Sequence, residues 1–211
     1  MESTLLIATT NPGKVREIRQ VLADVPCRLV TLADLAAIPE PEETGATFAA
    51  NARLKASAYA RASGLVTIAE DSGLVIDALG GRPGVESARY PGETYPDKFA
   101  NLYRELAPHP RPWTARYVCA IGVAGGAGGT GGTGGAGLIL FECEATVEGE
   151  IAALPAGTNG FGYDPIFFFP PYGCTLAEVD DARKLAVAHR GKAFRYLREK
   201  LLSSPPAPSA L

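Results

Sequence analysis

Two neighbouring carboxylates, Glu70 and Asp71, follow a short apolar run and are the clearest candidates for chemistry in the sequence. Residues 66–69 predict a buried strand, and sites in open α/β sheets lie where such strands end. Adjacent strand residues point to opposite faces, so only one carboxylate faces a given ligand squarely. We favour Asp71, because Ser72 and Gly73 indicate a turn that frees its side chain. Mg²⁺ prefers carboxylate and phosphate oxygens. A structural acidic turn is the alternative.

Six consecutive residues near the start of the chain suit an anion: Thr9, Thr10, Asn11, Pro12, Gly13 and Lys14. Residues 4–9 predict a strand, and the Asn-Pro pair predicts a capped helix directly after it. A helix N-terminus presents free backbone N–H groups and the positive end of the helix dipole, which together bind phosphates. A capped helix with a solvated lysine is the alternative interpretation.

A third group combines Glu43 with Asn51 and Lys55. Residues 47–63 are rich in alanine and predict a helix that ends near Gly64. Asn51 and Lys55 lie four residues apart, so they share one face of that helix, and Glu43 lies in the acidic turn before it. An amide and an ammonium on one face could follow a phosphate chain. A solvated helix face has a similar pattern.

Aromatic residues at 160–165 (GFGYDP) suggest a surface for a flat ligand. Phe161 and Tyr163 flank a glycine, and Asp164 is followed by a proline. A ring beside flexible backbone suits stacking on a nucleotide base.

A basic group follows towards the C-terminus, with Lys184 and the pair His189-Arg190. The only other histidine, His109, lies in a proline-rich loop and looks incidental. A single histidine near a helix start more often has a structural role than a catalytic one, so that alternative stays open.

The bulk composition indicates an ordinary globular protein. The chain has 211 residues, 46% of them hydrophobic and 20% charged, and a net charge of -3. This balance argues against binding to nucleic acid or to an anionic membrane, which needs a basic face. The four cysteines form no C-x-x-C pair, so we expect reduced thiols and a cytoplasmic location. There is no basic signal segment and no apolar run of about 20 residues, so we expect no membrane span.

The order of the predicted elements favours a mixed α/β fold. Strands and helices alternate in the first half, and alternating apolar residues at 115–123 and 139–147 predict an antiparallel pair later. We expect a single domain over residues 1–202, with a mobile Gly-rich loop at 124–137 and a disordered tail at 203–211. A phosphate cradle in that loop is disfavoured, because no lysine follows at the required spacing.

Six stretches together resemble the inosine/xanthosine triphosphate pyrophosphatase family, which acts on ITP, dITP and XTP. They are TTNPGK, ETGATFAANARLKA, EDSGL, ALGGRPGVESARY, GFGYDPIF and HRGKA, and they run in order from residue 9 to residue 193. The resemblance implies an elongated α/β fold with a central mixed sheet, two lobes and a cleft, usually in a homodimer.

The resemblance also implies roles for the residues above. The groups implied to hold the triphosphate lie in the TTNPGK stretch and the Ala-rich helix: Asn11, Lys14 and Lys55. Those implied to gather Mg²⁺ are Glu43, Glu70 and Asp71, with Asp71 activating the attacking water and Ser72 touching the substrate. Phe161 should stack on the base, and Gly162, Tyr163 and Asp164 should complete the surface on which the base lies. The residues that should contact the edge of the purine are Lys184, His189 and Arg190. Two departures are Glu70, where the family often has aspartate, and Ala188, where a serine is common.

The expected reaction is attack of water on the α-phosphorus of a nonstandard purine nucleoside triphosphate, with pyrophosphate leaving. Donors from His189 and Arg190 would pair with the 6-oxygen of hypoxanthine or xanthine and leave the amino group of adenine unpaired. The alternatives are a septum-inhibitor-type pyrophosphatase with another base preference and a sensor that binds the nucleotide without cleaving it.

Overall fold

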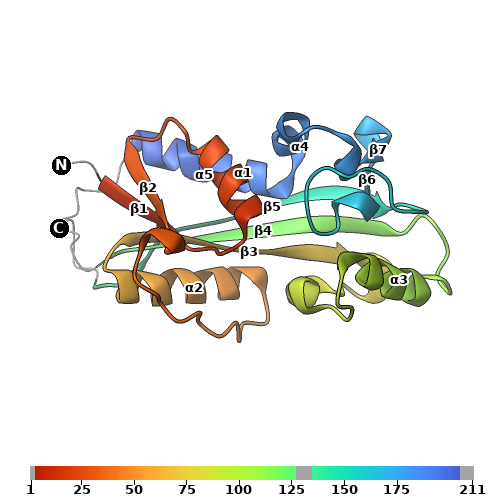
Figure 1. The fold of residues 1–211 in the computed structure, drawn as a ribbon, viewed down its shortest axis with the longest axis horizontal. Helices are drawn as coiled ribbons and strands as arrows, with labels where there is room; N and C mark the ends of the chain where they lie inside the picture. The colour runs from red at the N-terminus through yellow and green to blue at the C-terminus, as the bar shows by residue number, and fades with distance from the viewer. Residues whose placement is uncertain (1–2, 127–134, 205–211) are drawn as a thin grey trace. The chain divides into compact units, whose positions relative to one another are not determined.

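A mixed β-sheet flanked by helices organises the chain (Figure 1). The computed structural model describes residues 3–126 and 135–204. The strands are β1 (Ser3–Ile7), β2 (Cys27–Thr31), β3 (Val66–Ile76), β4 (Thr114–Ala124), β5 (Ile139–Ile151), β6 (Phe167–Phe169) and β7 (Cys174–Thr175). The α-helices are α1 (Pro12–Val21), α2 (Phe48–Ser63), α3 (Tyr95–Leu106), α4 (Asp181–Val187) and α5 (His189–Ser203).

The sheet combines a parallel part with an antiparallel part, which confirms the predicted mixed α/β class. Its strand order is β2-β1-β3-β4-β5-β6-β7. β1 is parallel to both β2 and β3, whereas β6 is antiparallel to β5 and β7. Hydrophobic alternation predicted β4 and β5 well. It did not predict β2 or the short helix α4.

The chain divides into two compact units, with β3, β4 and β5 each contributing residues to both. Unit 1 contains residues 1–71, 119–145 and 190–211, and unit 2 contains residues 72–118 and 146–189. The predicted single domain over 1–202 stays a prediction. Much of the expected mobile loop, at 127–134, and most of the expected tail, at 205–211, lie outside the described residues. Helix α5 continues to Ser203, the first residue of the expected tail.

Unit 1 buries both faces of its part of the sheet. Leu5 and Ile7 pack with α1 and α5 in one apolar cluster, while Leu6 and Ala8 pack with α2 in another. Figure 1 shows α1 and α5 on one side of these strands and α2 on the other. The near-continuous apolar run of β1 follows from this double coverage, because successive residues each meet a helix.

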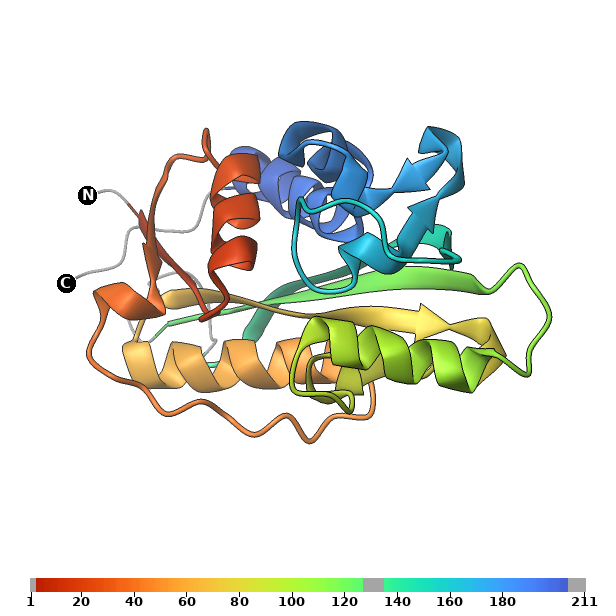
Figure 2. The same ribbon diagram turned by 45° about the vertical axis from the view of Figure 1, so that its right-hand side comes forward.

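Unit 2 has its own core, formed between α3 and the strands beside it (Figure 2). Leu102 and Leu106 of α3 are fully buried there, together with Leu74 and Ile76 of β3. Thr94 and Asp97 cap the start of α3 with reciprocal hydrogen bonds. Among residues 3–126 and 135–204, no helix is long and apolar enough to cross a membrane.

Candidate active site

The turn from β1 into α1 has the capped geometry that the sequence predicts. Asn11 Oδ1 accepts hydrogen bonds from the backbone N–H of Gly13 at 2.9 Å and of Lys14 at 3.2 Å, and Pro12 is the first helical residue. The Thr9 hydroxyl accepts from Asn11 N at 3.3 Å, and Thr10 is exposed. The expectation of free N–H groups at this helix start is therefore wrong for two of them, because the cap already binds them.

Strand β3 does not end at Glu70 and Asp71. It continues through Ser72 and Gly73 to Ile76, so the predicted turn after Asp71 is wrong. Leu74 and Ile76 are fully buried on the far side of the glycine, and their packing keeps the strand extended. The two carboxylates therefore alternate along one strand and point to opposite faces.

Glu70 faces the side of the sheet that α1 and α5 cover. Its Oε1 lies 2.6 Å from Lys14 Nζ, and its Oε2 accepts from the Cys119 thiol at 3.2 Å and lies 3.4 Å from Arg190 Nε. Burial raises the pKa of Glu70, but Arg190 and Lys14 outweigh it and lower that pKa well below the ordinary value. Glu70 is thus a buried carboxylate whose ionised form is stabilised by two cations.

Arg190 completes this group from the first turn of α5. Its guanidinium is buried and lies 2.7 Å from Glu17 Oε2. Burial lowers the pKa of Arg190, and Glu70 and Glu17 raise it above its ordinary value. Sequence reasoning missed Glu17, although its position three residues after Lys14 places both on one face of α1.

Asp71 faces the opposite side, where α2 packs. Its Oδ2 accepts from Asn51 Nδ2 at 3.1 Å, and its Oδ1 lies 3.2 Å from Lys55 Nζ. Lys55 Nζ also donates to Glu43 Oε1 at 2.5 Å. Burial raises the pKa of Asp71, Lys55 lowers it and Glu43 raises it, with a net upward shift. Burial lowers the pKa of Lys55, but Asp71 and Glu43 give it a net upward shift.

The loop that carries Glu43 is attached to α2 through Asn51. The Asn51 side chain is fully buried, and its Oδ1 accepts from Gly45 N at 2.7 Å. A Cβ on Gly45 would lie 2.6 Å from that same oxygen, so only glycine fits there. Asn51 therefore links the Glu43 loop to Asp71.

The structure brings together some of the predicted metal and phosphate residues and separates others. Glu43 and Asp71 share Lys55, whereas Glu70 and Lys14 form a different pair on the other face of β3. The expected set of three carboxylates is therefore not assembled. In the described part of the chain, no group of three or more His, Cys, Asp or Glu side chains is arranged to hold a metal ion.

The predicted base-binding residues of unit 2 converge on Asp164. Its Oδ2 accepts from Phe161 N at 2.9 Å and from Lys184 Nζ at 2.6 Å. Lys184 Nζ also lies 4.5 Å from the centre of the Phe161 ring. Gly160 has a φ of 75°, and a Cβ there would lie 2.2 Å from Asp164 Oδ2, so glycine is required for this closed loop.

Two further aromatic residues extend this group. Tyr163 is buried, and its hydroxyl donates to Ser87 O at 2.8 Å, while the Gly162 backbone lies beside Tyr95. The His189 ring stacks on Tyr117, with centroids 4.6 Å apart and planes 14° apart. The sequence did not indicate Tyr117 as a site residue, because it is one of the alternating apolar residues of β4 and such residues predict only a buried core.

Comparison with known proteins places this geometry in context. The Ham1 family model matches residues 5–200. The chain belongs to the Ham1 family. A dITP/XTP pyrophosphatase from Geobacillus kaustophilus is 45% identical over 199 residues, which cover 93% of this chain and 93% of that protein. One from Thermus thermophilus is 44% identical over 207 residues, covering 96% of this chain and 93% of the relative.

Solved structures of Ham1-family proteins have the same fold. A HAM1 protein from Coxiella burnetii superposes with a TM-score of 0.85 at 35% identity, covering 96% of this chain and all (100%) of that one. A nucleoside-triphosphatase / dITP/XTP pyrophosphatase from Mycobacterium abscessus gives a TM-score of 0.70 at 36% identity, covering 92% and 97%. The family resemblance predicted from six short stretches is confirmed.

Proposed function

We propose that this chain is an enzyme that hydrolyses nonstandard purine nucleoside triphosphates, namely dITP, ITP and XTP, to the monophosphate and pyrophosphate. The observation that carries the proposal is the Glu43–Lys55–Asp71 cluster. Its Asp71 lies within β3, just after the residues of that strand that pair in parallel with β1, in a chain 45% identical to a dITP/XTP pyrophosphatase. The relatives favour an enzyme over a sensor that only binds nucleotides, because they are named as pyrophosphatases.

Asp71 is the proposed general base. A water oxygen attacks the α-phosphorus, its proton passes to an Asp71 oxygen, and the bond from the α-phosphorus to the bridging oxygen of pyrophosphate breaks. A carboxylate with a raised pKa takes a proton more readily than an ordinary one. Asn51 and Lys55 fix the direction of both Asp71 oxygens, which supports a positioned base.

Lysines supply positive charge for the triphosphate. Lys55 lies between two carboxylates, and Lys14 lies at the start of α1, where the helix dipole also favours an anion. Lys14 Nζ is already paired with Glu70, so we propose that Glu70 orients this lysine and is not a metal ligand. Thr10 and Asn11 belong to the same turn and would border the phosphates.

Mg²⁺ fits the donors on the Asp71 face. Glu43 and Asp71 both present carboxylate oxygens within reach of one ammonium, so a single small cation could bind both, directly or through water. Mg²⁺ takes few protein ligands when phosphates and water complete its shell. When bound, it would neutralise phosphate charge and polarise the attacking water. The chain's own contribution is to hold in place Glu43 and Asp71, the second of which is also the proposed general base.

Base recognition is proposed for the unit 2 residues around Asp164. Phe161 would stack on the purine, and His189 would donate to the 6-oxygen, which adenine lacks. Ser72 stays a proposed substrate contact. Arg190 is buried between Glu17 and Glu70, so we propose that it positions Glu70, in place of the purine contact predicted from the sequence. Homodimer formation stays a prediction of the resemblance, and a cytoplasmic location stays a prediction from the cysteine pattern.

A substrate panel tests the proposal. Purified protein is incubated with dITP, XTP, dATP, dGTP, dTTP and UTP, with Mg²⁺ or with EDTA, and the products are separated by ion-exchange chromatography. We expect monophosphate and pyrophosphate from dITP and XTP with Mg²⁺, and little product with EDTA. Preference for dTTP or UTP would favour the septum-inhibitor type. Tight binding of dITP without pyrophosphate release would indicate a sensor and contradict the proposal.

A further inference from the structure

Tyr117 occupies a central position among the aromatic residues of unit 2. It lies on β4 and is buried, with only 6% of its surface exposed. The Tyr117 ring stacks on the His189 ring. It also stacks on the Phe167 ring, with ring centroids 4.5 Å apart and planes 30° apart. Phe167 is itself fully buried, so this side of the stack is fixed by the core. The plane of the His189 imidazole therefore depends on a rigid neighbour.

The Tyr117 hydroxyl reaches a second member of the same group. Tyr117 Oη lies 3.4 Å from Asp164 Oδ1, at the long end of hydrogen-bond distances. The other Asp164 oxygen accepts from Phe161 N and from Lys184 Nζ. One side chain thus contacts the histidine by its ring and the carboxylate that holds the Phe161 loop by its hydroxyl.

We infer that Tyr117 is a positioning residue for base recognition, which fixes the plane of His189 and, through Asp164, the loop that carries Phe161. This inference rests on the proposed function, because it takes His189 and Phe161 as the residues that meet the purine. Tyr117 itself need not touch the substrate.

A specific kinetic consequence follows from this role. A donor discriminates between a 6-oxygen and a 6-amino group only when its N–H direction is fixed, because a mobile ring can turn to satisfy either partner. Loss of the stack should therefore weaken selection between dITP and dATP. The groups around Asp71 are unaffected, so kcat for dITP should change little.

The experiment compares three variants. Tyr117→Leu removes the ring and the hydroxyl, and Tyr117→Phe removes only the hydroxyl. Tyr103→Leu is the matched control: Tyr103 packs against the same unit 2 core, and its buried hydroxyl has no hydrogen-bond partner in the described part of the chain. We expect Tyr117→Leu to lower the dITP-over-dATP ratio of kcat/KM by about 10-fold, mainly through KM. Tyr117→Phe should lower the same ratio by about 2-fold, and Tyr103→Leu should keep the wild-type ratio.

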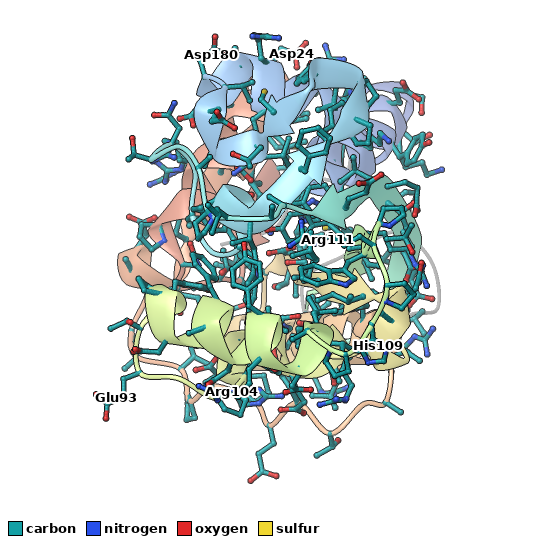
Figure 3. The ribbon with its side chains drawn as sticks, turned by 90° about the vertical axis from the view of Figure 1, so that its right-hand side faces the viewer. Asp24, Glu93, Arg104, His109, Arg111 and Asp180 are labelled. Carbon is teal, nitrogen blue, oxygen red and sulfur yellow. The ribbon has the colours of Figure 1, made fainter. Side chains whose placement is uncertain are left out.

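An NMR measurement on the wild-type protein checks the stack without any variant. The chain has two histidines, and His109 is exposed in the loop after α3 (Figure 3), where it serves as an internal reference. The ring protons of His189 should be shifted upfield from those of His109 by the Tyr117 ring current, and Tyr117→Leu should abolish the shift. If Tyr117→Leu does not fold, Tyr117→Met takes its place, because the flexible methionine side chain adapts to irregular space in a core.

The outcomes separate this inference from the proposed function. A wild-type protein that cleaves none of the nucleotides contradicts the proposed function, and the inference is then judged by binding. IMP added to wild type should move the His189 signals more than AMP does, and Tyr117→Leu should remove that difference. An unshifted His189 signal in wild type, or a Tyr117→Leu variant with wild-type selectivity, overturns the inference. A loss of kcat that is equal for all substrates also overturns it, because that pattern indicates a purely structural role.

Discussion

The two faces of β3 in unit 1 use adjacent carboxylates in opposite ways. On the α1 and α5 side, Glu70 is enclosed by Lys14, Arg190 and a thiol, and its pKa is lowered. On the α2 side, Asp71 shares Lys55 with a second carboxylate, and its pKa is raised. One peptide unit therefore separates a fixed anion from a carboxylate suited to accept a proton.

The difference comes from the charged groups that surround each carboxylate. Both side chains lose hydration by burial, which disfavours the charged form. Two cations outweigh that cost at Glu70, whereas Asp71 shares its one lysine with Glu43, whose own charge raises the pKa of Asp71 further. Residue type alone therefore does not assign a role to either acid. The role of each acid is assigned by the side chains that the helices covering its face of the strand place around it.

The largest expected effect is on the Glu70 face and concerns stability. Arg190→Met should lower the free energy of unfolding by about 3–5 kcal/mol, because it leaves Glu17 and Glu70 as buried charges that have lost a cation. Urea unfolding followed by circular dichroism measures the change.

Arg198→Met is the matched control for that measurement. Arg198 lies on the same helix but forms an exposed ion pair with Asp24, which Figure 3 labels at the surface. This variant should leave the unfolding midpoint nearly unchanged, since exposed ion pairs contribute little. Equal midpoints for the two variants would show that the buried network does not stabilise the fold.

The next effect is on the Asp71 face and concerns rate. Asp71→Asn keeps the shape of the side chain and removes its ability to accept a proton, so kcat for dITP should fall by at least about 100-fold. Steady-state release of pyrophosphate measures this loss. Asp77→Asn, at an exposed carboxylate just after the same strand, is the control and should retain near-normal turnover. Near-normal turnover of Asp71→Asn would remove Asp71 from the role of base.

The sequence predicted the elements on which this comparison depends better than it predicted the end of β3. Asn11-Pro12 and Gly64 marked the start of α1 and the end of α2, because caps are local hydrogen-bond patterns. Ser72-Gly73 looked like a turn by the same local logic. The strand continues there because buried residues on both sides of the glycine pack into cores, a tertiary effect that local propensity does not contain.

The candidate site could be predicted where its partners are close in sequence. Asn51 and Lys55 share a helix face by spacing alone. The pairing of Arg190 with Glu17 joins residues 173 positions apart, and no local pattern indicates it. The alternation rule separated Glu70 from Asp71 correctly, but the resemblance grouped both as metal ligands, and the structure separates them.

The smallest expected effect tests most directly the claim that the two faces differ in function. The Mg²⁺ concentration that gives half-maximal pyrophosphate release is measured for wild type, Glu43→Gln and Glu70→Gln. We predict that Glu43→Gln needs about 10-fold more Mg²⁺, as is typical when a group at a metal site is altered, and that Glu70→Gln needs the wild-type concentration. A large increase for Glu70→Gln with none for Glu43→Gln would contradict the account, because it would place the metal on the other face of the strand.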